Sequence, residues 1–77
     1  MGKMIITFDV ISVNRKEIKL TGDTKLIFKI CNPTKQMQTK AKKSDVVAVV
    51  VDEIDSNNII TTKEVMTLRE LQTTGGL

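Results

Sequence analysis

The chain has 77 residues and a net charge of +3, with twelve basic and nine acidic side chains. It contains no His, no Trp, no Tyr and a single Cys. These numbers indicate one small domain, rule out a disulfide within the chain, and argue against transition-metal sites and His-dependent catalysis.

Residues 4–13, MIITFDVISV, predict the first strand. Apolar side chains at every second position from Met4 to Val10 share one face. After Val10 the alternation goes out of phase, which predicts a β-bulge near that residue.

Residues 16–30, KEIKLTGDTKLIFKI, predict a hairpin around Gly22. A two-residue loop of Gly22 and Asp23 would mix polar and apolar side chains on both faces. A three-residue loop, residues 22–24, pairs Leu20 with Leu26, so we prefer that register. The same register pairs Ile18 with Phe28 and Glu17 with Lys29.

Residues 31–45 break the strand pattern. Asn32 and Pro33 fit the N-cap and first position of a helix, with Met37 and Ala41 as its apolar stripe. A basic loop explains the same residues equally well, so both alternatives stay open. Cys31 is expected to be a small buried side chain.

The next segment is an uninterrupted apolar run, which is typical of a central strand covered on both faces. Residues 33–43 are mostly Lys, Gln and Thr and would cover it poorly. We therefore expect this run to contact a protein partner or a second copy of the chain. The predicted interface residues are Val46, Val47, Ala48, Val49, Val50 and Val51.

The C-terminal third predicts a turn at 55–58, a short strand at Ile59 and Ile60, and a helix over 62–72. The prediction of this helix is based on a capping box formed by Thr61 and Glu64. A longer strand is the alternative. The predicted fold is α+β: a small antiparallel sheet of four to five strands with one C-terminal helix, or else all-β. Residues 1–72 form one domain and 73–77 a flexible tail.

Charge is unevenly distributed along the chain. Residues 15–43 carry nine basic and two acidic side chains, whereas residues 44–77 carry two basic and six acidic ones. This asymmetry predicts a basic patch for nucleic acid, or head-to-tail association of copies. The candidate phosphate-contacting residues are Lys35, Lys40, Lys42 and Lys43. Ten Lys against two Arg argues against base reading in a groove.

No motif for chemistry is recognisable. Asp52, Glu53 and Asp55 cluster before a turn, but a calcium loop begun at Asp55 lacks Gly at its sixth position and Glu at its twelfth. We predict no catalytic residue, no metal, no cofactor and no small-molecule substrate. Without a targeting or membrane-spanning segment, we expect a cytoplasmic, non-membrane protein.

Two short segments resemble known families. The terminal TTGGL resembles the Gly-Gly tail of ubiquitin-like proteins and sulfur carriers; this resemblance implies a β-grasp fold and conjugation through Gly76 after loss of Leu77. The stretch VDEIDSNNIITTKEVMTLREL is similar to half of a swapped-hairpin DNA-binding motif, without its turn Gly and helix Pro. The composition also fits a small phage or mobile-element protein.

The leading functional expectation is a non-enzymatic protein-interaction or self-assembly module. Nucleic-acid binding through the lysine-rich segment is the alternative, and a tail-conjugated carrier is a minor one.

Overall fold

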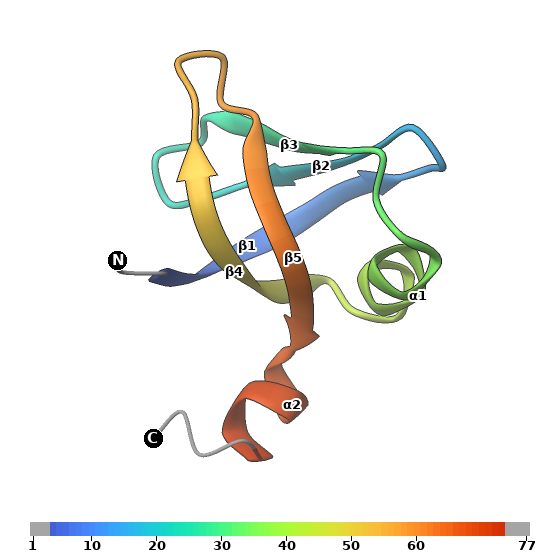
Figure 1. Ribbon diagram of the computed structural model, residues 1–77. Coiled ribbons are helices and arrows are strands. Elements are labelled where there is room, and N and C mark those ends of the chain that lie inside the picture. Colours follow the sequence, from blue (N-terminus) through green and yellow to red (C-terminus); the bar gives the residue numbers. More distant parts are fainter. Residues whose placement is uncertain (1–3, 74–77) are drawn as a thin grey trace.

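The computed structural model describes residues 4–73, which form five strands and two helices. In chain order these are β1 Met4–Val13, β2 Glu17–Thr21, β3 Ile27–Cys31, α1 Lys35–Lys43, β4 Val46–Ile54, β5 Ile60–Thr67 and α2 Leu68–Thr73 (Figure 1). Both helices are too short to span a bilayer, so the described residues contain no membrane-spanning helix.

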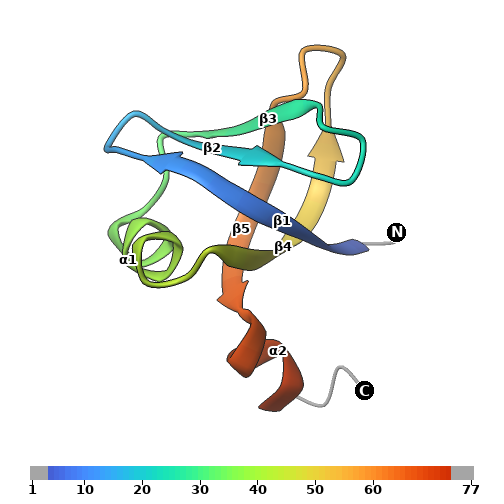
Figure 2. The ribbon, with the colours of Figure 1, turned by 180° about the vertical axis from the view of Figure 1, so that it is seen from behind.

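The strands form one sheet in the order β3-β2-β1-β4-β5, and all neighbours are antiparallel. The sheet curls until its outer strands meet in a parallel bridge between Lys29 and Ile59. There the Lys29 amide donates to the Asn58 carbonyl at 3.0 Å. Figures 1 and 2 show the resulting partly open barrel, with α1 beside one end. Helix α1 lies in the connection between β3 and β4, the two consecutive strands that are not neighbours in the sheet order.

This architecture confirms the predicted fold in part. The antiparallel sheet and the C-terminal helix are present, and α1 adds a second helix where helix and loop had both been open. Because strands make up most of the described residues, the structure agrees with the all-β alternative as well.

The predicted bulge in β1 is confirmed. Val10 pairs with Leu20, but Ser12 rather than Ile11 pairs with Lys19, so Ile11 is an extra residue on β1. The bulge bends the strand. As a result β1 pairs with β4 through its first half and with β2 through its second half.

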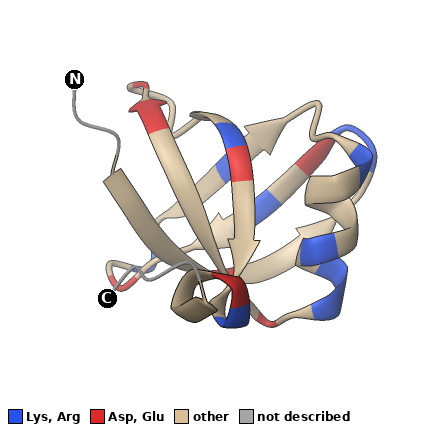
Figure 3. Ribbon diagram, turned by 60° about the horizontal axis from the view of Figure 1, so that its bottom comes forward, with Lys and Arg blue, Asp and Glu red and all other residues tan. Residues whose placement is uncertain are grey.

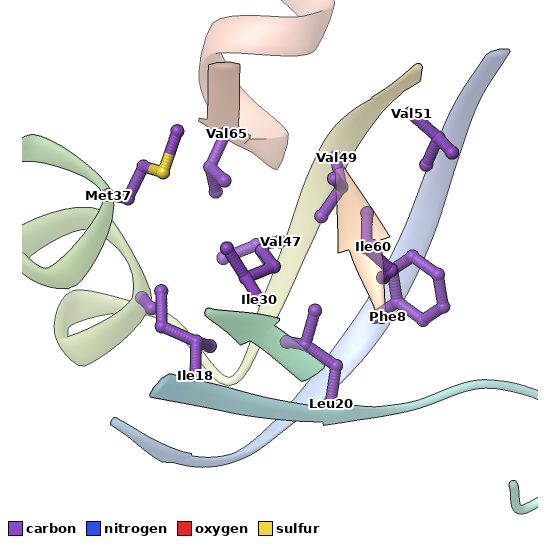
Figure 4. Packing of buried hydrophobic residues seen from close by; sticks show 11 residues of the cluster. Phe8, Ile18, Leu20, Ile30, Met37, Val47, Val49, Val51, Ile60 and Val65 are labelled. Atoms are coloured by element: carbon purple, nitrogen blue, oxygen red, sulfur yellow. The ribbon is translucent and has the colours of Figure 1, made fainter. Parts of the chain in front are cut away.

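A single hydrophobic cluster fills the barrel (Figure 4). The Phe8 and Phe28 rings pack against each other at a centroid distance of 5.3 Å, and Met37 reaches in from α1. Full burial of an aliphatic side chain contributes about 1.5–3 kcal/mol to folding. The buried members are Phe8, Ile18, Leu20, Ile30, Met37, Ala41, Val47, Val49, Val51, Ile60 and Val65.

The apolar run at residues 46–51, called the valine run below, forms the first part of β4, which is a central strand of the sheet. Val47, Val49 and Val51 point into the barrel and are buried within one chain. On the outer face Ala48 is also buried, whereas Val46 and Val50 are half-buried. Contact of this run with a partner stays a prediction, and Val46 and Val50 are the members that retain accessible surface.

The predicted register of the β2–β3 hairpin is wrong by two residues. Leu20 pairs with Phe28 and Ile18 with Ile30, which leaves a loop of residues 22–26. The Lys25 amide donates to the Gly22 carbonyl at 3.0 Å. A shift of two preserves which side chains face inward, because side chains alternate with a period of two.

The C-terminal helix begins later in the structure than the sequence predicts. Residues 60–67 form β5, and the helix starts only at Leu68. The capping box that operates is Thr67 with Glu70: the Thr67 amide donates to Glu70 Oε1 at 3.0 Å, and the Glu70 amide donates to Thr67 Oγ1 at 3.1 Å. Of the predicted tail, Thr73 belongs to α2, and the Gly-Gly-Leu end lies outside the described residues.

Two smaller expectations before α1 are also corrected. The N-cap is Thr34, whose side chain accepts the Met37 amide, and Asn32 lies two residues earlier in the left-handed conformation with φ 51°. Cys31 is exposed rather than buried. It alternates with the inward-facing Ile30 at the end of β3, and therefore projects outward.

Candidate nucleic-acid interface

Five exposed cations gather at one end of the barrel, which we call the basic end. Two come from the β1–β2 loop and three from α1; they are Arg15, Lys16, Lys35, Lys42 and Lys43. The two segments meet because the Asn32 amide, just before α1, donates to the Lys16 carbonyl at 2.8 Å. In Figure 3 the blue parts of the loop and of α1 lie on the same side.

The β1–β2 loop is held in shape by Asn14. Its side-chain oxygen accepts the amides of Lys16 at 2.8 Å and Glu17 at 3.0 Å. The Asn14 amide in turn donates to the Glu17 carbonyl at 3.0 Å. This Asx turn reverses the chain within three residues, so the side chains of Arg15 and Lys16 remain exposed to solvent.

Helix α1 is fixed by its cap and its apolar stripe. Thr34 Oγ1 accepts the Met37 amide at 3.1 Å, which satisfies one of the unpaired donors of the first turn. Met37 and Ala41 are buried in the barrel. The opposite face is exposed. Lys42 and Lys43 lie in the last turn, where cations also interact favourably with the helix dipole.

Three lysines outside the basic end take part in ion pairs. Glu17 lies 3.7 Å from Lys19 Nζ and 3.8 Å from Lys29 Nζ. Lys40 Nζ lies 3.1 Å from Glu70 Oε2. Across residues 4–73, none of the five cations of the basic end forms an ion pair with a described residue. They are therefore available to an external anion.

Three of the four predicted phosphate-contacting lysines belong to the basic end, and the fourth does not. Lys35, Lys42 and Lys43 are exposed on α1, whereas the side chain of Lys40 is only 18% exposed and pairs with Glu70. Sequence reasoning included Arg15 and Lys16 in the charge count but not in the site. Asn14, a turn-forming residue directly after the first predicted strand, could have indicated that Arg15 and Lys16 lie in an exposed turn.

A shallow groove of about 560 Å³ adjoins the C-terminal end of α1. Lys43 and Arg69 both line it, and Asp45 is the acidic residue of its lining. The groove thus brings a sixth cation, from α2, next to the basic end. Its remaining lining residues are Ser44, Val46, Thr67 and Leu68.

One acidic residue of the β4–β5 hairpin, Asp55, has a structural role. Asp55 Oδ1 accepts the amides of Asn57 at 2.8 Å and Ile59 at 3.0 Å, which closes the turn. The positive φ of Asn58, 63°, belongs to the same turn. Among the described residues, no group of carboxylate or Cys side chains has an arrangement that could hold a metal ion.

The contact between the two helices depends on Glu70. The hydrogen bond from the Thr67 amide, followed by the bond and charge of Lys40, lowers the pKa of Glu70 below its ordinary value of 4.5. A lowered pKa means that the charged form stabilises the fold above pH 4.5, and that this contribution disappears as the pH falls through the folded-state pKa.

We expect Lys40→Gln to raise the pKa of Glu70 towards 4.5 without reaching it, because the Thr67 amide still donates to the carboxylate. An NMR titration of the Glu70 carboxyl carbon measures this change. Lys63→Gln, an exposed lysine on β5, is the control. An unchanged Glu70 pKa in Lys40→Gln would contradict the ion pair.

Comparison with protein families, curated proteins and solved structures finds no match.

Proposed function

We propose that the protein binds nucleic acid through the basic end, without reading its sequence. The observation that carries this proposal is the meeting of two separate basic segments whose five cations are exposed and unpaired with described residues. Phosphate groups are the usual partners of such a surface, and their neutralisation releases counterions.

Salt dependence tests the proposal. If all five cations contact phosphates of a duplex, log K falls against log salt with a slope of about −4 to −5. Fluorescence anisotropy with labelled 20-nucleotide DNA, as duplex and single strand, measures the slope. Arg15→Gln with Lys16→Gln is expected to flatten it by about 2. The control, Lys25→Glu, lowers the net charge by the same amount in the β2–β3 loop and should leave the slope nearly unchanged.

Absence of binding to either DNA at low salt would overturn the proposal, as would affinity that does not change with salt. A simple preliminary measurement uses the lack of Trp and Tyr. Because the protein absorbs little at 280 nm, a strong 260 nm peak in a purified preparation would reveal bound nucleic acid.

A second candidate function is self-association, favoured by the outer face of β1 and β4. Ile5 is 50% exposed and lies opposite half-buried Val50. Strand β2 pairs with β1 only from Asp9 onward, so residues 4–8 have one edge without a described strand partner. Exposed apolar edges of this kind favour pairing between chains. A monomer at both low and high salt in light scattering would remove this candidate.

A further inference from the structure

The exposed face of α1 carries its charge at its two ends. Lys35 lies in the first turn, and Lys42 and Lys43 lie in the last. Between them, Gln36 and Thr39 are exposed and uncharged. No acidic residue belongs to this helix, since its sequence is KQMQTKAKK.

Other segments enlarge both charged ends. Lys16 and Arg15 adjoin the start of α1 through the bond between the Lys16 carbonyl and the Asn32 amide. Arg69 lines the same groove as Lys43 at the other end. The first cluster is thus Arg15, Lys16 and Lys35, and the second is Lys42, Lys43 and Arg69.

The separation of the two clusters suits a duplex. The eight helical rises from residue 35 to residue 43 span about 12 Å. The major groove of B-DNA is also about 12 Å wide, accepts an α-helix, and is bordered by one phosphate backbone on each side. A helix lying across this groove can place one cation cluster on each backbone. A flexible single strand offers no such pair of backbones at a fixed spacing.

The aromatic residues point to the same ligand. Proteins that bind single strands stack bases on exposed aromatic side chains. This chain has two Phe and no Trp or Tyr. Phe8 is 3% exposed and packs at a tilt against half-buried Phe28. Unpaired bases would therefore find no exposed aromatic ring to stack on, whereas a duplex keeps its bases stacked on each other.

Building on the proposed function, we infer that the ligand is double-stranded nucleic acid and that α1 lies across its groove, with one cation cluster on each backbone. Fluorescence anisotropy with a 20-base-pair DNA duplex and with each of its separate strands tests this inference. At about 100 mM salt we expect the duplex to bind at least tenfold more tightly than either strand.

Variants of the two clusters test the geometry. Lys35→Gln with Lys16→Gln, and Lys42→Gln with Lys43→Gln, should each weaken duplex binding roughly tenfold. Lys25→Glu lowers the net charge by the same amount in the β2–β3 loop and should weaken it less than threefold. Circular dichroism should show equal thermal stability for all three variants and the wild type.

Each alternative outcome has a definite meaning. Equal or tighter binding of a single strand overturns the duplex inference and leaves nucleic-acid binding intact. Sensitivity to only one cluster overturns the two-backbone geometry. Heparin binding as tight as the duplex would show a general polyanion surface and overturn the inference. Binding of neither DNA overturns this inference and the proposed function together.

Discussion

Replacement of Leu20 by alanine is expected to lower the free energy of unfolding by about 2–5 kcal/mol. Leu20 is fully buried and pairs with Phe28 across the β2–β3 hairpin. Its removal leaves a cavity in the hydrophobic cluster, and the cavity adds to the cost of the lost burial. For a domain of this size the melting temperature should fall by at least about 10 °C. Thermal unfolding followed by circular dichroism measures the loss.

Leu26→Ala is the matched control, because the same atoms are removed from a side chain that is 52% exposed in the hairpin loop. We expect it to change stability by less than about 0.5 kcal/mol. The register predicted from sequence pairs Leu20 with Leu26 and would make both substitutions costly. Equal losses in the two variants would therefore contradict the observed register.

The origin of the register error lies in the loop. The faces of β2 and β3 were predictable, because alternation alone places Ile18 and Leu20 inward. Loop length was not predictable in the same way: a turn residue with positive φ is usually Gly or Asn, and here it is Lys25 with φ 64°. A shift of two residues leaves the face pattern unchanged.

The C-terminal segment illustrates competition between local and distant contacts. Thr61 with Glu64 and Thr67 with Glu70 both have the capping-box spacing. Pairing with β4 decides between them, since Val65 lies opposite Val49 and Glu64 opposite Val50. Helix α2 begins where this pairing ends, after Thr67. Pairing with β4 is a contact between distant parts of the chain, so the sequence around the two capping boxes does not show which of them begins the helix.

The candidate site, like the fold, was predictable only in part from the sequence. A lysine-rich segment with an apolar stripe indicates an exposed basic face if it is helical, and three of the four predicted lysines lie on that face. Two features depend on tertiary structure. Lys40 forms an ion pair with Glu70, thirty positions away, and the Lys16 carbonyl accepts a hydrogen bond from the Asn32 amide.

The valine run provides the second large expected effect. Val49→Lys places an ammonium group in the core at a position that is 0% exposed, and none of the buried residues among those described carries a carboxylate. Burial of an unpaired charge is among the few changes that cost more than about 4 kcal/mol. A domain of this size has only about 5–15 kcal/mol of stability. We expect this variant to be largely unfolded by circular dichroism.

Val50→Lys differs by one position and should have the opposite result. Val50 is half-buried on the outer face and pairs with exposed Glu64 on β5, so a lysine can extend to solvent beside a carboxylate. We expect a folded protein with a stability change of about 1 kcal/mol or less. Unfolding of both variants would mean that the outer face of β4 is as tightly covered as the inner one.

Light scattering on Val50→Lys then separates the two roles of the strand. If the outer face joins copies of the chain, the wild type is an oligomer at low and high salt, and Val50→Lys is a monomer. If the run serves only the core, the two proteins have the same mass and differ from Val49→Lys in folding alone. Because inner and outer residues alternate along one strand, adjacent substitutions with the same side chain assign each face its role independently.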